Sequence, residues 1–229
     1  LHSLVFPCTS AVISGKATQD GRPILWKNRD SNSEKNSLAY FEGKKFAFTG
    51  VINSNDQDGK EIWMGSNTVG FSIMNTHSYN VKVPENYKDI LDQEGVFMRE
   101  ALETCRNLAD FEKMIKKTTN KRGVTANFGV IDAEGGAAYY ECGPDKCTKY
   151  DVNDPLQAPF GFLVRTNFSP SQEMDKGEAF ARFQSASTIL YQLWLKKDLT
   201  ISGLLNTAVR DLSNPFTGLD PLKQPIQQS

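Results

Sequence analysis

A cysteine near the start of the sequence has the surroundings of a nucleophile. Cys8 opens the apolar stretch "CTSAVISG", which predicts a strand, and a second strand, "ILWKN", leads into the charged cluster "KNRD". The thiolate is the reactive form of cysteine, so a base or a cation must lie near it. Histidine is the usual base, but the sequence has only His2 and His77. A pair formed by Cys8 and His77 is one route to a thiol enzyme.

A second route needs no histidine. If the bond between Pro7 and Cys8 is cut, the new α-amine, with a pKa of about 8, lies beside the thiol and can act as its general base. The cut would come from attack of the thiol on the Pro7 carbonyl or from an outside protease. We therefore expect residues 1–7 to be a leader and residues 8–229 to form the working domain. While Pro7 acylates the amine, the chain is expected to be inactive.

The rest of the sequence predicts the elements that position these groups. Alternating apolar patterns predict strands at 8–15, 24–28, 38–43, 45–52, 61–67, 69–76, 126–133, 135–143, 149–153 and 160–168. Helical spacing runs over 94–118, with a break at 107–110 where Asp110 is expected to cap the second helix, and returns from 178 and over 201–212. The order strands, helices, strands, helices favours an α+β fold in which helices enclose two sheets.

The bulk composition excludes several classes of function. The 229 residues fit one large domain or two small ones, and 27 acidic residues against 26 basic ones give no basic surface for nucleic acid. No apolar run approaches the roughly 20 residues of a membrane span. Two histidines argue against a histidine-rich metal centre, and we expect no cofactor.

The other three cysteines have simpler interpretations. Cys105 lies on the apolar side of the predicted helix and is expected to be a buried small hydrophobe. Cys142 and Cys147 flank a turn in "CGPDKC", which is not the C-x-x-C spacing of redox or zinc motifs. They are either a hairpin disulfide or two free thiols. The apolar leader and this pair favour an extracytoplasmic location.

The segment "CTSAVISGKATQDGRPILWKNRD" resembles the opening of the N-terminal nucleophile (Ntn) hydrolases of the choloylglycine hydrolase group. That group includes bile salt hydrolases, penicillin V acylases, acid ceramidases and penicillin-forming acyltransferases. The resemblance implies that Asp30 binds the free α-amine of Cys8 and that Lys27 replaces an arginine near the thiol. Lysine keeps a cation there but lacks the arginine fork. Arg29 neighbours Asn28 and Asp30 along the strand, so it should point away from them.

Three later segments extend the resemblance. "VGFSIMNTHSYN" places Asn75 at the oxyanion-hole asparagine, "LVRTNFSP" places Asn167 at the second catalytic asparagine, and "AFARFQSAS" places Arg182 at the distal arginine. The implied fold is a four-layer αββα sandwich, and "ANFGVIDAEGGAAYYE" resembles its central hairpin. The late strands of the family are not recognised before Ser229. We therefore expect either that these strands lie on a separate fragment or that the protein is a shortened member of the family.

The resemblance implies cleavage of a linear C–N amide through an acyl-thioester on Cys8. If water attacks the thioester, the protein is a hydrolase. If another amine attacks the thioester, the protein is an acyltransferase. A non-catalytic binding module on the same fold is the alternative, favoured by the leader and by Lys27. The implied partner is a small amide of an apolar acyl group, selected by loops around Tyr40, Phe46, Trp63 and Tyr79. The sequence allows the protein to form a homo-oligomer.

Overall fold

The computed structural model describes residues 8–31, 33, 35–174 and 177–210. Pro7, the expected leader 1–7 and the segment from 211 onwards lie outside the described residues. The elements therefore begin with the strand that follows Cys8.

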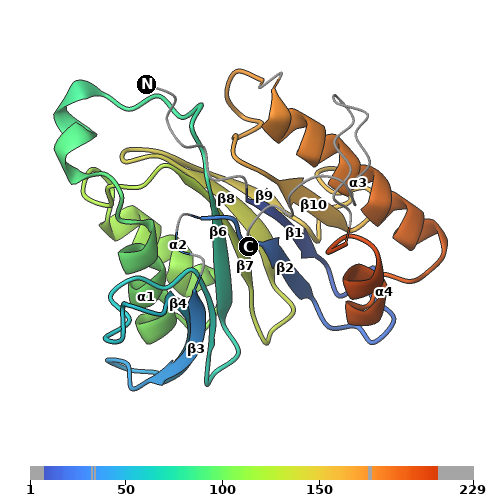
Figure 1. The fold of residues 1–229 in the computed structure, drawn as a ribbon, viewed down its shortest axis with the longest axis horizontal. Coiled ribbons are helices and arrows are strands. Elements are labelled where there is room, and N and C mark those ends of the chain that lie inside the picture. Colours follow the sequence, from blue (N-terminus) through green and yellow to red (C-terminus); the bar gives the residue numbers. More distant parts are fainter. Residues whose placement is uncertain (1–7, 32, 34, 175–176, 211–229) are drawn as a thin grey trace.

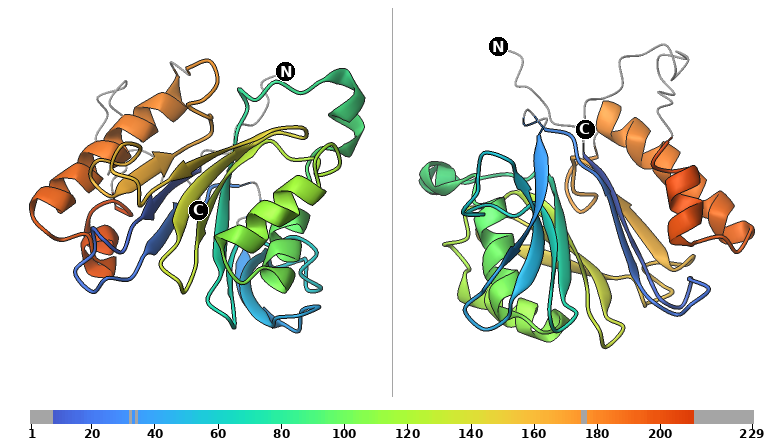
Figure 2. Two further views of the ribbon diagram at one scale, coloured as in Figure 1. Left: turned by 180° about the vertical axis from the view of Figure 1, so that it is seen from behind. Right: turned by 60° about the horizontal axis from the view of Figure 1, so that its bottom comes forward.

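Two antiparallel sheets lie face to face (Figures 1 and 2). The large sheet has the strand order β3-β4-β5-β6-β7-β8-β9, and the small sheet has the order β10-β1-β2. The strands of the large sheet are β3 (Asn36–Phe41), β4 (Phe48–Asn53), β5 (Met64–Asn67), β6 (Ser72–His77), β7 (Ala126–Ile131), β8 (Ala137–Cys142) and β9 (Cys147–Asp151). Those of the small sheet are β1 (Thr9–Ile13), β2 (Ile24–Asn28) and β10 (Phe162–Arg165).

Helices cover the outer face of each sheet. Helices α1 (Glu94–Thr104) and α2 (Leu108–Lys117) share one apolar core with the large sheet, while α3 (Glu178–Leu195) and α4 (Ile201–Asn206) share another with the small sheet. A third core fills the space between the sheets. The right panel of Figure 2 shows this layering, with α1 and α2 on one side and α3 and α4 on the other. The predicted α+β fold with an αββα arrangement is confirmed.

The break between α1 and α2 is where the sequence placed it, but the capping residue differs. The Asn107 side chain accepts the hydrogen bond from the Asp110 main-chain N–H (3.0 Å), so Asn107 is the N-cap and the prediction of Asp110 was wrong. An N-cap asparagine satisfies one of the free N–H groups of the first turn. The Asp110 carboxylate instead pairs with Arg106 and Lys113, which hold its pKa well below the ordinary value.

Three other details differ from expectation. Helix α4 ends at Asn206 rather than at 212, and residues 207–210 form a turn. Strand β10 ends at Arg165 rather than at 168, so Asn167 lies in the loop after the strand. A 3₁₀ helix, η1 (Glu85–Ile90), precedes α1, and the apolar pattern gave no sign of it. No described helix is long and apolar enough to cross a membrane.

Strand alternation separates the two faces of the small sheet. Val12 of β1 belongs to the core between the sheets, whereas its neighbour Ala11 belongs to the core under α3 and α4. The register pairs Ser10 with Lys27 and Thr9 with Asn28. Paired residues of an antiparallel sheet share a face. Lys27 therefore faces the large sheet, and Asn28 faces the helices.

The cysteine pair of the β8–β9 hairpin is a disulfide. Cys142 and Cys147 are opposite each other in the register, and their sulfur atoms are bonded. The structure thus decides between the two interpretations that the sequence left open. Cys105 is a free thiol, 1% exposed, in the core of the large sheet and α1, as predicted.

Candidate active site

Cys8 lies at the end of the space between the two sheets. Its side chain is free and 8% exposed, and its thiol donates a hydrogen bond to the main-chain carbonyl of Asp30 (3.5 Å). Continuing the register of β1 and β2 by one residue places Cys8 opposite Arg29. Cys8 therefore shares a face with Ser10 and Lys27, directed toward the large sheet.

Lys27 reaches across to the large sheet. Its ammonium donates hydrogen bonds to the Trp63 carbonyl (3.0 Å) and to Asn75 Oδ1 (2.9 Å). Burial lowers the Lys27 pKa to about 8, while the charge of Cys8 acts to raise it. Lys27 is thus a cation at neutral pH that interacts electrostatically with the thiol.

Arg29 directly follows β2 and lies on the same face as Lys27, as strand alternation predicts. Its guanidinium lies 5.0 Å from the centre of the Trp63 ring and donates to Asn53 Oδ1 (2.7 Å) and to Asn36. Burial lowers the pKa of Arg29, and the charge of Cys8 opposes this effect. Arg29 therefore joins β2 to the edge of the large sheet and adds a second cation near the thiol.

Arg182, in the first turns of α3, connects the groups around Cys8. Its Nη1 donates to the Cys8 carbonyl (2.5 Å) and to Thr9 Oγ1 (3.1 Å), and its Nη2 donates to Asn167 Oδ1 (2.9 Å). Burial lowers the Arg182 pKa, opposed by the charges of Tyr79, Cys8 and, more weakly, Asp30. One rigid guanidinium thus fixes the main chain of the cysteine and the asparagine together.

Asn167 is 1% exposed, and both the oxygen and the nitrogen of its side-chain amide are hydrogen-bonded. Its Oδ1 accepts from Arg182, and its Nδ2 donates to the His77 carbonyl (3.1 Å). The Asn167 carbonyl accepts from the Tyr79 N–H (3.2 Å). An asparagine amide has two N–H groups, so among the described residues one of them is left to donate to a further acceptor.

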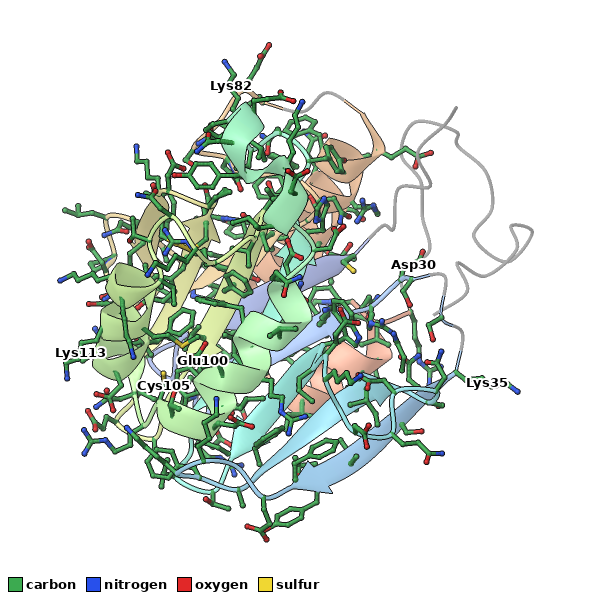
Figure 3. The ribbon with its side chains drawn as sticks, turned by 90° about the vertical axis from the view of Figure 1, so that its left-hand side faces the viewer. Asp30, Lys35, Lys82, Glu100, Cys105 and Lys113 are labelled. Atoms are coloured by element: carbon green, nitrogen blue, oxygen red, sulfur yellow. A yellow bond between two sulfur atoms is a disulfide. The ribbon has the colours of Figure 1, made fainter. Side chains whose placement is uncertain are left out.

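Asp30 follows β2, where alternation directs its side chain away from the face that carries Lys27. Burial raises its pKa, and the positive charge of Arg182 acts in the opposite direction. Figure 3 shows Asp30 on a different side of the molecule from Cys105. Asp30 contributes its main-chain carbonyl to the Cys8 thiol, a contact that the sequence did not suggest.

Asn75 joins the site through Lys27. It lies on β6 with Ile73 and pairs with Phe128, and both of these apolar neighbours belong to the core under α1. The Asn75 side-chain oxygen accepts a hydrogen bond from the Lys27 ammonium, so Asn75 positions this cation.

His77 has partners other than Cys8. Its Nδ1 lies 3.7 Å from Glu94 Oε1 and 3.5 Å from Thr125 Oγ1. The structure records no hydrogen bond between His77 and Cys8 in the described part of the chain. The main-chain carbonyl of His77 contributes to the site instead, because it accepts from Asn167.

Sequence reasoning missed Thr9 as a member of the site, and it expected Trp63 only near the loops that select the substrate, not in contact with Lys27 and Arg29. Thr9 could have been found, because it completes the Cys-Thr pair that carried the resemblance. Trp63 acts through its carbonyl and its ring face, for which a sequence offers no signal. Among the described residues, no cluster of histidine, cysteine and carboxylate side chains could hold a metal ion.

Several solved structures share this fold. One is the Caenorhabditis elegans ortholog of N-acylethanolamine-hydrolyzing acid amidase, with TM-score 0.57 and 16% identity over 85% of this chain and 86% of that one. Another is a single-residue variant of conjugated bile acid hydrolase from Clostridium perfringens, with TM-score 0.57 and 13% identity over 87% and 77% of the two chains. At these identities the likeness shows the fold alone.

Sequence comparisons identify the family more directly. No curated protein sequence matches the chain. A family model does match it over residues 17–221, which include every described site residue except Cys8 and Thr9. The chain therefore belongs to the family described as acyl-coenzyme A:6-aminopenicillanic acid acyl-transferase, among the Ntn hydrolases.

Proposed function

We propose that the protein is a cysteine amidohydrolase that cleaves the linear C–N amide of an apolar acyl group through an acyl-thioester on Cys8. The observation that carries the proposal is the Arg182 guanidinium, which binds the Cys8 carbonyl, Thr9 Oγ1 and Asn167 Oδ1 at once. A nucleophile and an oxyanion donor held by one rigid group have the fixed geometry that acyl transfer requires.

Removal of residues 1–7 would complete the site. The free α-amine of Cys8 would then take the thiol proton, and Asp30 would hold the resulting ammonium. The Cys8 thiol already donates a hydrogen bond to the main-chain carbonyl of Asp30 (3.5 Å). The new α-amine of Cys8 would therefore form close to Asp30. In this proposal the Pro7–Cys8 bond is the processing site.

The chemical steps follow from the charges at the site. Cys8 Sγ attacks the amide carbonyl, while Asn167 Nδ2 donates to the oxygen that becomes negative. The cation of Lys27, held by Asn75, favours the thiolate before the attack. The Cys8 ammonium then gives its proton to the leaving amine, and the thioester forms. Water attacks the thioester and releases the carboxylic acid and the free thiol.

Acyl transfer is the second candidate function. Its support is the family model, whose description names an acyltransferase. An amine in place of water would attack the same thioester and form a new amide. The two functions share every residue of the site and differ only in the acceptor.

One experiment tests the proposal. The full chain is expressed, its N-terminal residue is identified by mass spectrometry, and octanoyl, phenylacetyl and palmitoyl amides of aminomethylcoumarin are assayed with and without added amines. We expect loss of residues 1–7 and release of the coumarin. Processed protein that cleaves none of the amides, or a Cys8→Ala variant that cleaves them as well as the natural chain, would contradict the proposal.

The protein's location and assembly belong to the same proposal. The Cys142–Cys147 disulfide supports an extracytoplasmic site of action, because structural disulfides persist in oxidising compartments. The described small sheet has three strands against seven in the large one, so we also propose that a second fragment adds strands to it.

A further inference from the structure

Two polar residues lie side by side in the interior between the sheets. Asn127 of β7 and Glu141 of β8 are opposite each other in the register, and they are 0% and 5% exposed. The alternate positions Gly129 and Tyr139 share this face. A side chain at Gly129 would meet Val12 of β1, and the Tyr139 hydroxyl shares a hydrogen bond with Ser10 of β1 (2.9 Å), so the face is directed toward the small sheet. We call Asn127 and Glu141 the anchor pair.

Asn127 holds the main chain on both sides of Asn167. Its amide Nδ2 donates to the carbonyls of Thr166 (3.2 Å) and Phe168 (3.0 Å), and its Oδ1 accepts from Ser169 Oγ (2.7 Å). The same amide also donates to Thr76 Oγ1 in β6 (3.1 Å). A single side chain of the large sheet therefore fixes three positions around Asn167.

Glu141 holds the two ends of the same segment. Its Oε1 accepts from Arg165 Nε (2.7 Å), and its Oε2 accepts from the Ser171 N–H (3.0 Å). The Arg165 and Glu141 side chains are 5% and 1% exposed. Residues 166–171 are here called the Asn167 loop. The anchor pair holds Arg165 directly before this loop, three positions within it, and Ser171 at its end.

The buried Glu141–Arg165 ion pair costs desolvation free energy, which indicates a role other than stabilising the fold. A buried ion pair is often no more stabilising than apolar side chains of the same volume, because both charges lose their hydration. The Asn167 loop follows β10, so it has no strand partner to fix its main chain. Displacement of a catalytic group by about 1 Å can reduce a rate by about 10²-fold.

We propose that the anchor pair positions Asn167 for the reaction at Cys8. Asn127 and Glu141 are positioning residues: they act through the main chain of the Asn167 loop and make no contact with Cys8 in the described structure. The inference rests on the proposed function, because it assigns these residues a role in the same acyl transfer. Thr166 Oγ1, which donates to the Ala179 carbonyl (2.8 Å), extends the same support to the start of α3 and hence to Arg182.

The test compares Asn127→Ala with Asn67→Ala in the full chain. Asn67 is a matched control: it is also a buried asparagine, 6% exposed, whose Nδ2 holds two carbonyls, those of Leu102 and Cys105, away from the site. We expect Asn127→Ala to lower kcat for the coumarin amides about 10²-fold with KM nearly unchanged. Asn67→Ala should lower the melting temperature similarly and leave kcat close to that of the natural chain.

A double variant separates positioning from general damage. If Asn127 acts through Asn167, then Asn127→Ala combined with Asn167→Ala should be no slower than Asn167→Ala alone. Additive losses, or equal kcat for the Asn127 and Asn67 variants, would overturn the inference. Should Asn127→Ala fail to fold, Asn127→Asp, which keeps the shape and removes both donors, is measured with the same expectation.

The outcome also shows which proposal has failed. If Asn167→Ala and Cys8→Ala leave amide cleavage unchanged, the proposed function is wrong. If both abolish cleavage while Asn127→Ala and Glu141→Gln behave like Asn67→Ala, only the role of the anchor pair is wrong.

Discussion

Cys8 and Cys105 are both free, buried thiols, yet their surroundings are opposite in kind. Cys105 lies in the apolar core beneath α1, and burial raises its pKa to about 11. Cys8 interacts electrostatically with three cations, Lys27, Arg29 and Arg182. Burial is thus common to both thiols, and nearby positive charge separates the candidate nucleophile from the inert one.

The difference also concerns the main chain. The Cys8 carbonyl is held by Arg182, whereas the Cys105 N–H makes the last helical hydrogen bond of α1, to the Ala101 carbonyl. Cys105 ends a helix, and its role is to fill space. Cys8 directly precedes β1, and its carbonyl is held by the same guanidinium as the Asn167 side chain, so its position is fixed relative to the proposed oxyanion donor.

The largest expected effect comes from removing each thiol in turn. Cys8→Ala should abolish cleavage of the coumarin amides, because the proposed acyl-thioester forms on the Cys8 sulfur. Cys105→Ala should leave kcat unchanged and cost about 1 kcal/mol of unfolding free energy. Steady-state kinetics and urea unfolding measure the two quantities. Activity that depends on Cys105 instead would reverse the comparison.

A smaller loss of kcat is expected when the guanidinium of Arg182 is replaced. Arg182→Lys keeps the charge but cannot bind the Cys8 carbonyl, Thr9 and Asn167 together, so kcat should fall about 10²- to 10³-fold. Arg106→Lys, on an exposed arginine paired with Asp110, is the control and should have no effect. An Arg182→Lys variant with full activity would show that positive charge alone is sufficient.

The pH dependence should report the charge on Lys27. Its pKa is about 8, so kcat/KM should decline as the pH rises above about 8, by up to about tenfold for each pH unit. Lys27→Arg should remove this decline, because arginine stays protonated. A decline that is unchanged in Lys27→Arg would assign it to another group.

The same residue predicts an effect on stability. Its pKa in the fold, about 8, is below the ordinary 10.5, so the buried ammonium destabilises the protein fully below pH 8. This destabilisation should diminish as the pH rises from 8 toward 10.5. The difference in unfolding free energy between Lys27→Met and the natural chain should shrink over the same interval.

The two thiols should also differ in how fast they are labelled. In folded protein at neutral pH, iodoacetamide should modify Cys8 at least about tenfold faster than Cys105, whose thiolate is rare at a pKa of about 11. Peptide mapping by mass spectrometry measures both rates in one sample. Equal rates would mean that the cations near Cys8 do not activate it.

Much of the fold followed from local pattern. Alternation predicted each strand of both sheets, and the helical period predicted α1 and α2 with the break between them. The cap was missed because Asn107 and Asp110 both favour helix starts, and only the geometry of the first turn decides between them. The early end of β10 was missed because "LVRTNF" remains apolar and alternating beyond Arg165.

The proximity of several side chains was predictable because they belong to motifs. The structure brings Cys8, Lys27, Asn167 and Arg182 together, and it links Asn75 to them through Lys27. What could not be predicted are contacts made by main-chain carbonyls, such as those of Trp63 and His77. Every residue has a carbonyl, so the sequence cannot mark the ones that the fold directs inward.

The pairing of Ser10 with Lys27 sets a rule for altering the length of this protein. We expect residues inserted or removed between positions 19 and 22, the exposed tip of the β1–β2 hairpin, to leave Cys8 on its face, whereas Ser14 at the base of the turn is buried and hydrogen-bonded to Gly161. One residue inserted between Cys8 and Ser10 would instead turn the sulfur toward α3. Insertion scanning of this hairpin should therefore show tolerance in the turn and complete loss of activity at the start of β1, even where the fold survives.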